Sequence, residues 1–101
     1  MNKRNANGYW TMSAPVISEG HLAEEVHEAM METLPGEDFH GALCMIGSHG
    51  ALVRCDDLEL LPSDTPACLR NALEWAKGEG FEWVRFDTDG DVIPGLELFE
   101  W

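Results

Sequence analysis

Apolar residues recur with two different spacings along this chain, and this alternation constrains its fold more than any other feature. In residues 19–34 ("EGHLAEEVHEAMMETL"), Leu22, Val26 and Met30 recur every four residues, which is typical of the buried face of a helix. Residues 41–55 ("GALCMIGSHGALVRC") form two short apolar runs around "GSHG", a pattern that predicts an antiparallel hairpin. The sequence therefore mixes helical and extended segments.

A second helix is predicted after Thr65, which we expect to act as its N-cap with Pro66 in the first helical position. Gly78 and Gly80 would end this helix. Its buried face would consist of four apolar residues at helical spacing: Leu69, Ala72, Leu73 and Ala76. Ser18 is the corresponding expected N-cap of the first helix.

The remaining extended segments complete the predicted fold. Residues 9–18 read as an edge strand or arm, because Pro15 lacks a backbone donor. Residues 82–86 ("EWVRF") and the closing segment to Trp101 read as two further strands. We therefore predict an α+β fold with two helices packed on one face of a mainly antiparallel sheet, in the order β-α-β-β-α-β-β. The chain of 101 residues suits a single domain, residues 9–101, after a flexible tail over residues 1–8.

Three aspartates alternate in "FDTDGDVIPG", as they do at the start of a calcium-binding loop. Such a loop also needs glycine at its sixth position and a bidentate glutamate at its twelfth. Counted from Asp87, these positions hold Val92 and Leu98. The segment therefore predicts a tight hairpin turn centred on Asp89-Gly90 instead of a metal site.

The charge of the chain excludes several classes of function. It has 19 acidic and 6 basic side chains, a formal net charge of −13, and two of the basic ones, Lys3 and Arg4, lie in the expected tail. Such a surface repels nucleic acid and anionic membranes and attracts basic proteins. No secretory signal or apolar membrane span is evident, and the three widely spaced cysteines suit reduced thiols. We expect a cytoplasmic protein.

A di-iron site and a thiol enzyme are two possible interpretations of the histidines and cysteines, and both are weaker than a structural role for these residues. Glu24 and His27 form one Glu-x-x-His pair, whereas a di-iron bundle requires two such pairs and two further glutamates. A thiol enzyme would use Cys44 or Cys55 with His49 or His40, but an acidic surface opposes the low thiol pKa that this chemistry needs. We expect neither an enzyme nor a cofactor.

The last third of the chain resembles a family of small bacterial proteins of unknown function that occur on plasmids and integrative elements. The similarity lies in a "G-x-x-W" entry to a strand (Gly80 to Trp83), an "F-D-x-D-G" turn (Phe86 to Gly90) and a terminal "G-L-x-x-x-x-W" (Gly95 to Trp101). These motifs imply no particular chemistry. They imply an origin on mobile DNA, whose proteins must survive the defence systems of a bacterial host.

The acidic residues themselves suggest a function as a mimic of DNA. Glu25, Glu28 and Glu32 share one face of the first predicted helix, with backbone rises of about 4.5 and 6 Å, comparable to one or two phosphate steps of about 3.4 Å. Short acidic proteins of this kind resemble anti-CRISPR and anti-restriction inhibitors. The predicted partner-binding surface comprises Glu24, Glu25, Glu28, Glu32, Asp56, Asp57, Glu59, Asp87, Asp89 and Asp91.

The sequence thus favours an inhibitor that occupies the positively charged DNA-binding site of a CRISPR or restriction complex in a bacterial host. One alternative is a non-catalytic regulatory module that binds a basic protein partner without imitating DNA. A second alternative is a small Cys/His enzyme. In each case we expect no direct binding of nucleic acid and no membrane association.

Overall fold

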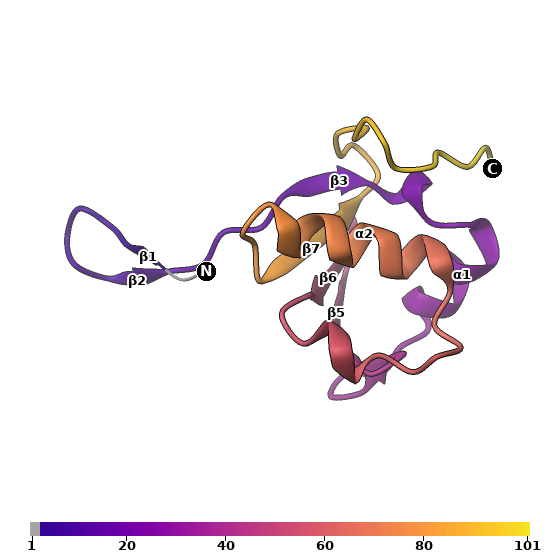
Figure 1. Ribbon diagram of the computed structural model, residues 1–101, viewed down its shortest axis with the longest axis horizontal. Helices are drawn as coiled ribbons and strands as arrows, with labels where there is room; N and C mark the ends of the chain where they lie inside the picture. The colour runs from indigo at the N-terminus through magenta and orange to yellow at the C-terminus, as the bar shows by residue number, and fades with distance from the viewer. Residues whose placement is uncertain (1–2) are drawn as a thin grey trace.

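A computed structural model describes residues 3–101 of the chain (Figure 1). Its elements are β1 (Lys3–Arg4), β2 (Trp10–Thr11), β3 (Val16–Ser18), the 3-10 helix η1 (Glu19–His21), α1 (Glu24–Met31), β4 (Asp38–Phe39), β5 (Ala42–Gly47), β6 (Gly50–Arg54), the 3-10 helix η2 (Leu58–Leu60), α2 (Ala67–Gly78) and β7 (Trp83–Asp87).

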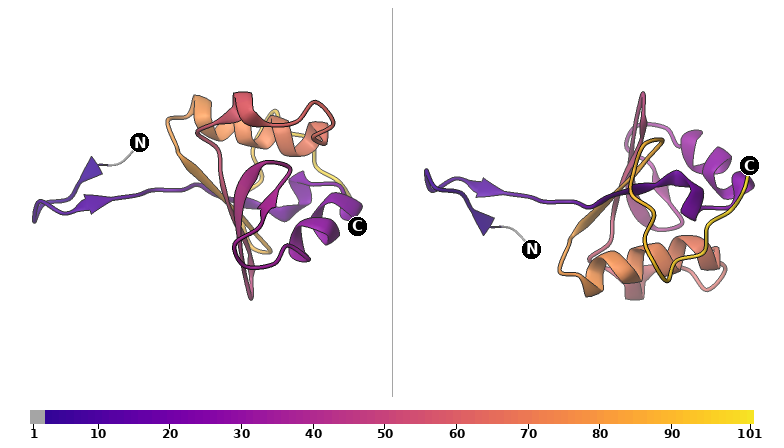
Figure 2. Two further views of the ribbon diagram at one scale, coloured as in Figure 1. Left: turned by 90° about the horizontal axis from the view of Figure 1, so that it is seen from below. Right: turned by 90° about the horizontal axis from the view of Figure 1, so that it is seen from above.

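The main sheet has five strands in the order β3-β7-β6-β5-β4. The β3–β7 pair is parallel, and the other three pairs are antiparallel. Along β6 and β7, buried Ala51, Val53, Val84 and Phe86 point to the side covered by the helices, while their neighbours point to the other face. Figure 2 shows both helices beside the same strands. The predicted α+β class, with two helices on one face of a mainly antiparallel sheet, is confirmed.

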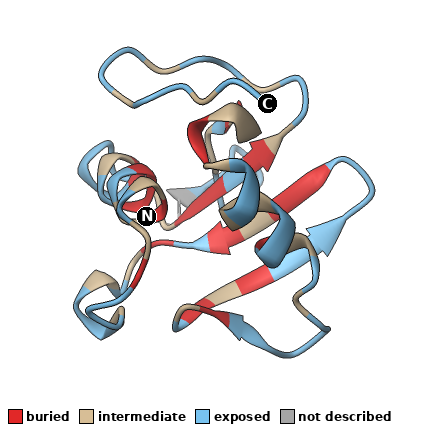
Figure 3. Ribbon diagram, turned by 90° about the vertical axis from the view of Figure 1, so that its right-hand side faces the viewer, coloured by how far each residue is buried: buried red, intermediate tan, exposed pale blue. Residues whose placement is uncertain are grey.

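The hydrophobic core lies between this face and the helices. Leu69 and Leu73 of α2 and Met30 of α1 are fully buried in one cluster with Phe86 and Ile17 of the sheet. Figure 3 shows the buried residues in the strands and on the inner sides of the helices, and the exposed ones in the loops. The outer face of each helix, α1 as well as α2, is therefore exposed to solvent.

Helix α2 and the β5–β6 hairpin agree closely with the sequence prediction. The four residues predicted for the buried face of α2 are its buried residues. The strands β5 and β6 are joined by a two-residue turn, Ser48-His49, within the predicted "GSHG". However, the N-cap of α2 is Pro66 and not Thr65, because Pro66 is the residue that keeps an extended ψ of 137° before the helix. The predicted cap at Thr65 was wrong by one residue.

The first helix is shorter than predicted. Ser18 does act as a cap, since its Oγ accepts a hydrogen bond from the Gly20 N–H at 3.1 Å, but the helix that it caps is η1. Leu22 then adopts an extended conformation, which places its side chain fully in the core and interrupts the helical hydrogen bonding. Helix α1 starts only at Glu24, with Ala23 as its N-cap.

The closing strand to Trp101 is not formed. Strand β7 ends at Asp87, and beyond it only Asp91 makes a β-bridge, with Ile17 on β3. The Asp91 N–H donates to Val16 O at 3.0 Å, and its C=O accepts from the Ser18 N–H at 2.8 Å. The chain therefore crosses over the end of β3 and covers the outer edge of that strand. We call residues 91–101 the C-terminal strap.

Residues 3–11 form a small antiparallel hairpin, β1–β2, which projects from the body of the molecule (Figure 1). The Arg4 guanidinium lies 4.0 Å from the centre of the Trp10 ring, a cation–π contact within the hairpin. The flexibility of residues 1–8 stays a prediction, and residues 1 and 2 lie outside the part that the structure describes.

Candidate functional site

Helix α1 carries the largest set of unpaired carboxylates. Glu24, Glu25 and Glu28 lie in the helix and Glu32 is its C-cap, and all four are exposed. Within residues 3–101, none of the four side chains has a hydrogen bond or ion pair. Glu25, Glu28 and Glu32 share a face through their i, i+3 and i+7 spacing. The face opposite to them is anchored in the core by Met30. We call these four residues the α1 acidic stripe.

The stripe is not explained by the stability of the helix itself. Glu24 and Glu25 lie in the first turn, where the helix dipole favours negative charge. Glu32 at the C-cap lies at the negative end of the dipole, and the last turn contains no basic residue. Glu24 and Glu28 are like charges at i, i+4, a spacing that is destabilising by a few tenths of a kcal/mol. The helix dipole therefore accounts for Glu24 and Glu25 but not for Glu28 and Glu32.

The second predicted cluster, Asp56, Asp57 and Glu59, is partly neutralised. Arg54 donates two hydrogen bonds of 2.7 Å to the Asp56 carboxylate, which hold the pKa of Asp56 below its usual value. Lys77 Nζ donates to the Asp56 main-chain oxygen at 2.9 Å and lies 3.8 Å from Glu59 Oε2. Asp57 alone is exposed without such a partner among the described residues. Asp56 is therefore a structural residue.

In the third cluster, Asp87 also has a structural role. Its Oδ1 accepts a hydrogen bond from the Asp89 N–H at 2.9 Å, and its Oδ2 lies 2.9 Å from Arg85 Nη2. The bond from the Asp89 main chain, followed by the charge of Arg85, lowers the pKa of the Asp87 carboxyl. Asp89 and Asp91 are exposed. This arrangement is an Asx-type turn, in which the Asp87 carboxylate holds the turn in place.

The turn differs from the prediction in its position. The Gly90 N–H donates to Asp87 O at 3.2 Å, so Thr88 and Asp89 are the central residues and Gly90 is the fourth. Glycine is required there because a Cβ on Gly90 would overlap the main-chain carbonyl of Ile17, over which the chain passes. The prediction of a turn centred on Asp89-Gly90 was wrong, because the glycine serves a close approach between backbones and not a hairpin.

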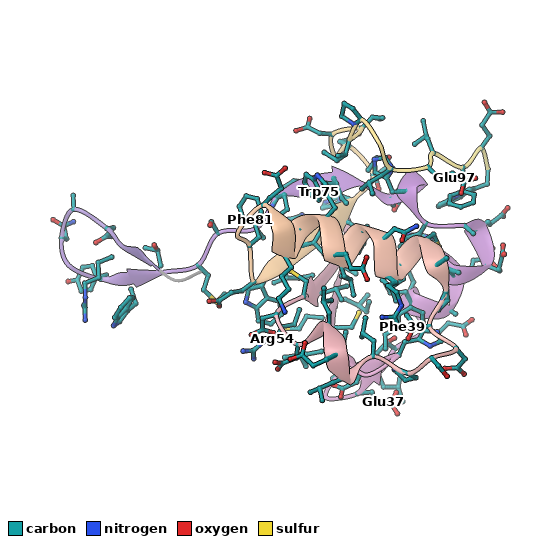
Figure 4. All side chains as sticks on the ribbon, in the orientation of Figure 1. Glu37, Phe39, Arg54, Trp75, Phe81 and Glu97 are labelled. Atoms are coloured by element: carbon teal, nitrogen blue, oxygen red, sulfur yellow. The ribbon has the colours of Figure 1, made fainter. Side chains whose placement is uncertain are left out.

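The three acidic clusters do not form one surface. Asp87 lies at the C-terminal end of β7, where it pairs with Gly50 and Ser18. Asp56 lies near the opposite end of β7, because the N–H of its neighbour Cys55 donates to the Glu82 main-chain oxygen just before that strand. The Asp56 cluster is thus separated from the Asp87 turn by the length of β7, about 13 Å at 3.3 Å per residue. In Figure 4 Arg54, the partner of Asp56, lies well away from the end of the molecule occupied by α1.

One acidic residue that the sequence analysis did not select lies beside the stripe. Glu97, in the strap, lines with Glu25 a hollow of about 250 Å³ between α1 and the start of α2. The strap is fixed there because the Glu97 main-chain oxygen is 2.8 Å from His21 Nδ1. No local sequence signal identifies this neighbour, since Glu25 and Glu97 are brought together only by the path of the strap.

The residues considered for metal or thiol chemistry are not arranged for it. His27 Nε2 lies 3.0 Å from Glu19 Oε2 and not beside Glu24, and its ring contacts Trp101 with 4.9 Å between centroids. Burial raises the pKa values of Cys44 and Cys55 to about 11, which opposes thiolate formation. Residues 3–101 contain no group of three or more His, Cys, Asp or Glu residues placed to hold a metal ion.

Neither of the α-helices found in residues 3–101 has the length and hydropathy needed to cross a membrane.

A family model described as "Family of unknown function (DUF5983) C-terminal domain" matches residues 14–101. The match starts just before β3, so it covers the α+β body and the strap and excludes the β1–β2 hairpin. No curated protein matches the sequence significantly. No solved structure matches it significantly.

Proposed function

The chain belongs to the DUF5983 C-terminal domain family of unknown function, and we propose that it is an acidic inhibitor that imitates DNA. In this proposal the protein occupies a positively charged DNA-binding site on a subunit of a bacterial CRISPR or restriction complex. It acts in the cytoplasm of the host, without catalysis and without binding nucleic acid itself. Its source is a plasmid or integrative element, as the resemblance of its last third suggests.

The observation that carries the proposal is the α1 acidic stripe. Four exposed carboxylates stand on one short helix without partners in the described chain, in a protein of net charge −13. Glu28 and Glu32 gain nothing from the helix dipole, so a role outside folding accounts for these two residues better than a role in helix stability. Their spacing along the helix matches one to two phosphate steps. A channel lined by Lys and Arg would attract such a surface at long range and accelerate binding.

We propose a narrower contact surface than the one expected from the sequence. Asp56 and Asp87 are engaged by Arg54 and Arg85, so their charges are largely neutralised within the chain. We therefore centre the mimic surface on the α1 acidic stripe and add Glu97, which lines a hollow with Glu25. Asp89 and Asp91, at the end of β7 from which the strap departs, are secondary contributors.

A second function is favoured by the same stripe. A regulatory module could use it to bind a basic protein partner at a surface that never contacts DNA. Competition separates the two functions, because duplex DNA must displace a mimic from its target and need not displace a module. The test starts by isolating the target from a host lysate on the immobilised protein, followed by binding measurements with and without duplex DNA.

The sharpest variant is a double substitution, Glu28→Lys with Glu32→Lys. Lysine near the C-terminal end of a helix is favoured by the dipole, so the fold should survive. Affinity for the target should fall by more than tenfold, chiefly through slower association. Protection of the target from DNA should be lost to the same degree.

A matched control exists on α2. Glu74→Lys with Glu79→Lys makes the same change of charge at the same kind of place, since Glu79 is the C-cap of α2 as Glu32 is of α1. Both control residues are exposed. If the two double variants weaken binding equally, the effect comes from net charge and the α1 acidic stripe is not the contact surface. Undiminished inhibition by the α1 variant would contradict the proposal.

A further inference from the structure

The C-terminal strap is attached to the body of the molecule at its start, in its middle and at its end. Asp91 bonds to β3 at the start, Phe99 bonds to η1, and the Trp101 Nε1–H donates to the main chain just before α1. Figure 1 shows the strap, in yellow, running alongside β3 and η1 toward the end of the molecule where α1 lies. The attachment in the middle of the strap is a histidine side chain, that of His21.

His21 is only 1% exposed, and both of its ring nitrogens contact the main chain of the strap. The Ile93 N–H donates to Nε2 at 2.9 Å, and Nδ1 lies 2.8 Å from Glu97 O. Because Nε2 accepts a hydrogen bond, it carries no proton, and Nδ1 carries the proton that is donated to Glu97 O. We call this arrangement the His21 clamp. It requires a neutral imidazole ring in one particular tautomer.

Protonation of His21 breaks one of the two bonds of the His21 clamp. A proton on Nε2 turns the acceptor of the Ile93 N–H into a second donor. Two N–H groups would then face each other across 2.9 Å, so Ile93 must move away from the ring. The bond from Nδ1 to Glu97 O is kept, since Nδ1 donates in both forms of the ring. A proton therefore competes with the Ile93 N–H for Nε2.

The side chains around His21 do not oppose a positive charge on its ring. His21 lines the hollow of about 250 Å³ between α1 and the start of α2. The other titratable side chains that line it are Glu25 from α1, Cys68 from α2 and Glu97 from the strap. Among the described residues that line this hollow, none is Lys or Arg. A protonated His21 would thus share the hollow with two carboxylates and with no fixed positive charge.

The neighbouring histidine, His27, responds to acid in the opposite sense. Its Nε2 lies 3.0 Å from the carboxylate of Glu19 on η1, and its ring contacts that of Trp101 with 4.9 Å between centroids. Protonation of His27 would strengthen the ion pair with Glu19 and add a cation–π attraction to Trp101. Acid therefore keeps the end of the strap in place while it weakens the attachment of the middle.

From these observations we propose that the strap is a pH-sensitive flap, whose middle segment, residues 93–97, detaches from the body when His21 is protonated. Ile93 and Leu96, which pack against the core, then become exposed, and the hollow that Glu97 lines is opened. This inference goes beyond the proposed function and does not depend on it.

The direction of the pH dependence follows from the number of bound protons. The released strap leaves Nε2 free to bind a proton, whereas the clamped strap does not, so the released state is favoured as the pH falls. A histidine that is free to titrate does so near pH 6.5. The ratio of released to clamped molecules should therefore rise about tenfold between pH 7.5 and pH 5.5. The His21 clamp is fully formed above this range and weakens through it.

Amide hydrogen exchange of the full chain at pH 7.5 and pH 5.5 tests the proposal. After correction for the intrinsic pH dependence of exchange, the ratio of open to closed states at the Ile93 amide should be about tenfold higher at pH 5.5. This ratio should also exceed that of the Leu73 amide in α2 at both pH values, since the strap opens without the core. An unchanged ratio at Ile93 would overturn the proposal. Equal ratios at Ile93 and Leu73 would overturn it too, because the strap would then open only with the whole fold.

Two substitutions assign the response to one histidine. His21→Gln keeps an amide group that can bond to the strap but cannot titrate, so the ratio at Ile93 should change by less than about twofold over the same pH range. His27→Gln removes the neighbouring histidine and should retain the rise of about tenfold. A full rise in the His21→Gln variant, or its loss in the His27→Gln variant, would contradict the proposal.

The ring nitrogens of His21 provide a test that needs no variant. In isotope-labelled wild-type protein at pH 7.5, nitrogen NMR should show a neutral ring with its proton on Nδ1, and a coupling across the hydrogen bond from the Ile93 amide to Nε2. A proton on Nε2 at this pH would overturn the proposal, because Ile93 would then have no acceptor to lose.

Discussion

At the scale of single residues, the acidic character of the chain hides two different uses of carboxylates. Asp56 and Asp87 each contact an arginine and each has a lowered pKa, so they hold β6 and β7 to the loops that follow. Glu28 and Glu32 have no such partners in residues 3–101. The sequence alone does not distinguish the paired carboxylates from the unpaired ones, because the fold and the side-chain directions determine which carboxylate meets an arginine.

Gly90 gives the most specific prediction at this scale. Gly90→Ala should destabilise the protein by about 2 kcal/mol or more, because the new Cβ would overlap the Ile17 carbonyl and either β3 or the strap must move. Urea denaturation measures the change. Gly78→Ala serves as the control, since nothing lies within 4 Å of a Cβ placed there. It should be neutral or slightly stabilising, and equal effects of the two substitutions would contradict the close approach.

The three cysteines should differ in reactivity. At pH 8, a thiol with a pKa of about 11 is ionised to about one part in a thousand, so Cys44 and Cys55 should react very slowly with iodoacetamide. Cys68 is only partly buried and should be labelled first. Mass spectrometry of the native protein should therefore show one modification at early times, and three after unfolding in urea. Early labelling of Cys44 or Cys55 would show that the core opens more readily than its packing implies.

At the scale of elements, local signals were sufficient for α2 and for the β5–β6 hairpin. The spacing of Leu69 and Leu73 and the "GSHG" turn determine these elements from neighbouring residues alone. The sequence did not predict the break before α1 or the strap, because both depend on distant contacts. His21 is buried and contacts residues 72 and 76 positions away, and no local pattern indicates such partners.

The strap should depend on His21. The Ile93 N–H donates to His21 Nε2 at 2.9 Å, so the opposite nitrogen, Nδ1, carries the proton and donates to Glu97 O. His21→Ala leaves both main-chain groups without partners and should cost about 2–4 kcal/mol. Amide exchange should accelerate at Ile93 and Phe99, while α2 stays protected.

Two comparisons distinguish this clamp from simple packing. His21→Phe retains apolar volume and loses both hydrogen bonds, so it should also accelerate exchange in the strap. His49→Ala removes an exposed side chain in the β5–β6 turn and should change stability by no more than about 0.5 kcal/mol. If His21→Phe left exchange at Ile93 unchanged, the hydrogen bonds would not be what holds the strap.

At the scale of the whole molecule, the net charge of −13 opposes the compact state. Raising the salt concentration from 0.01 to 0.1 M shortens the Debye length from about 30 to about 10 Å and weakens this repulsion. The melting temperature should therefore rise, by about 4–8 °C for each kcal/mol gained in a domain of this size. A flat or falling series would show that self-repulsion has no significant effect on stability.

A charge variant tests whether the salt effect comes from the net charge of the folded chain. The Glu74→Lys, Glu79→Lys variant is four charge units less negative, so its melting temperature should respond less steeply to salt. The salt series is repeated at several protein concentrations, because self-association would make the melting temperature depend on concentration. If the slope of the variant equalled that of the wild type, the net charge would not be the source of the salt effect, and the folded chain would tolerate its charge without measurable loss of stability.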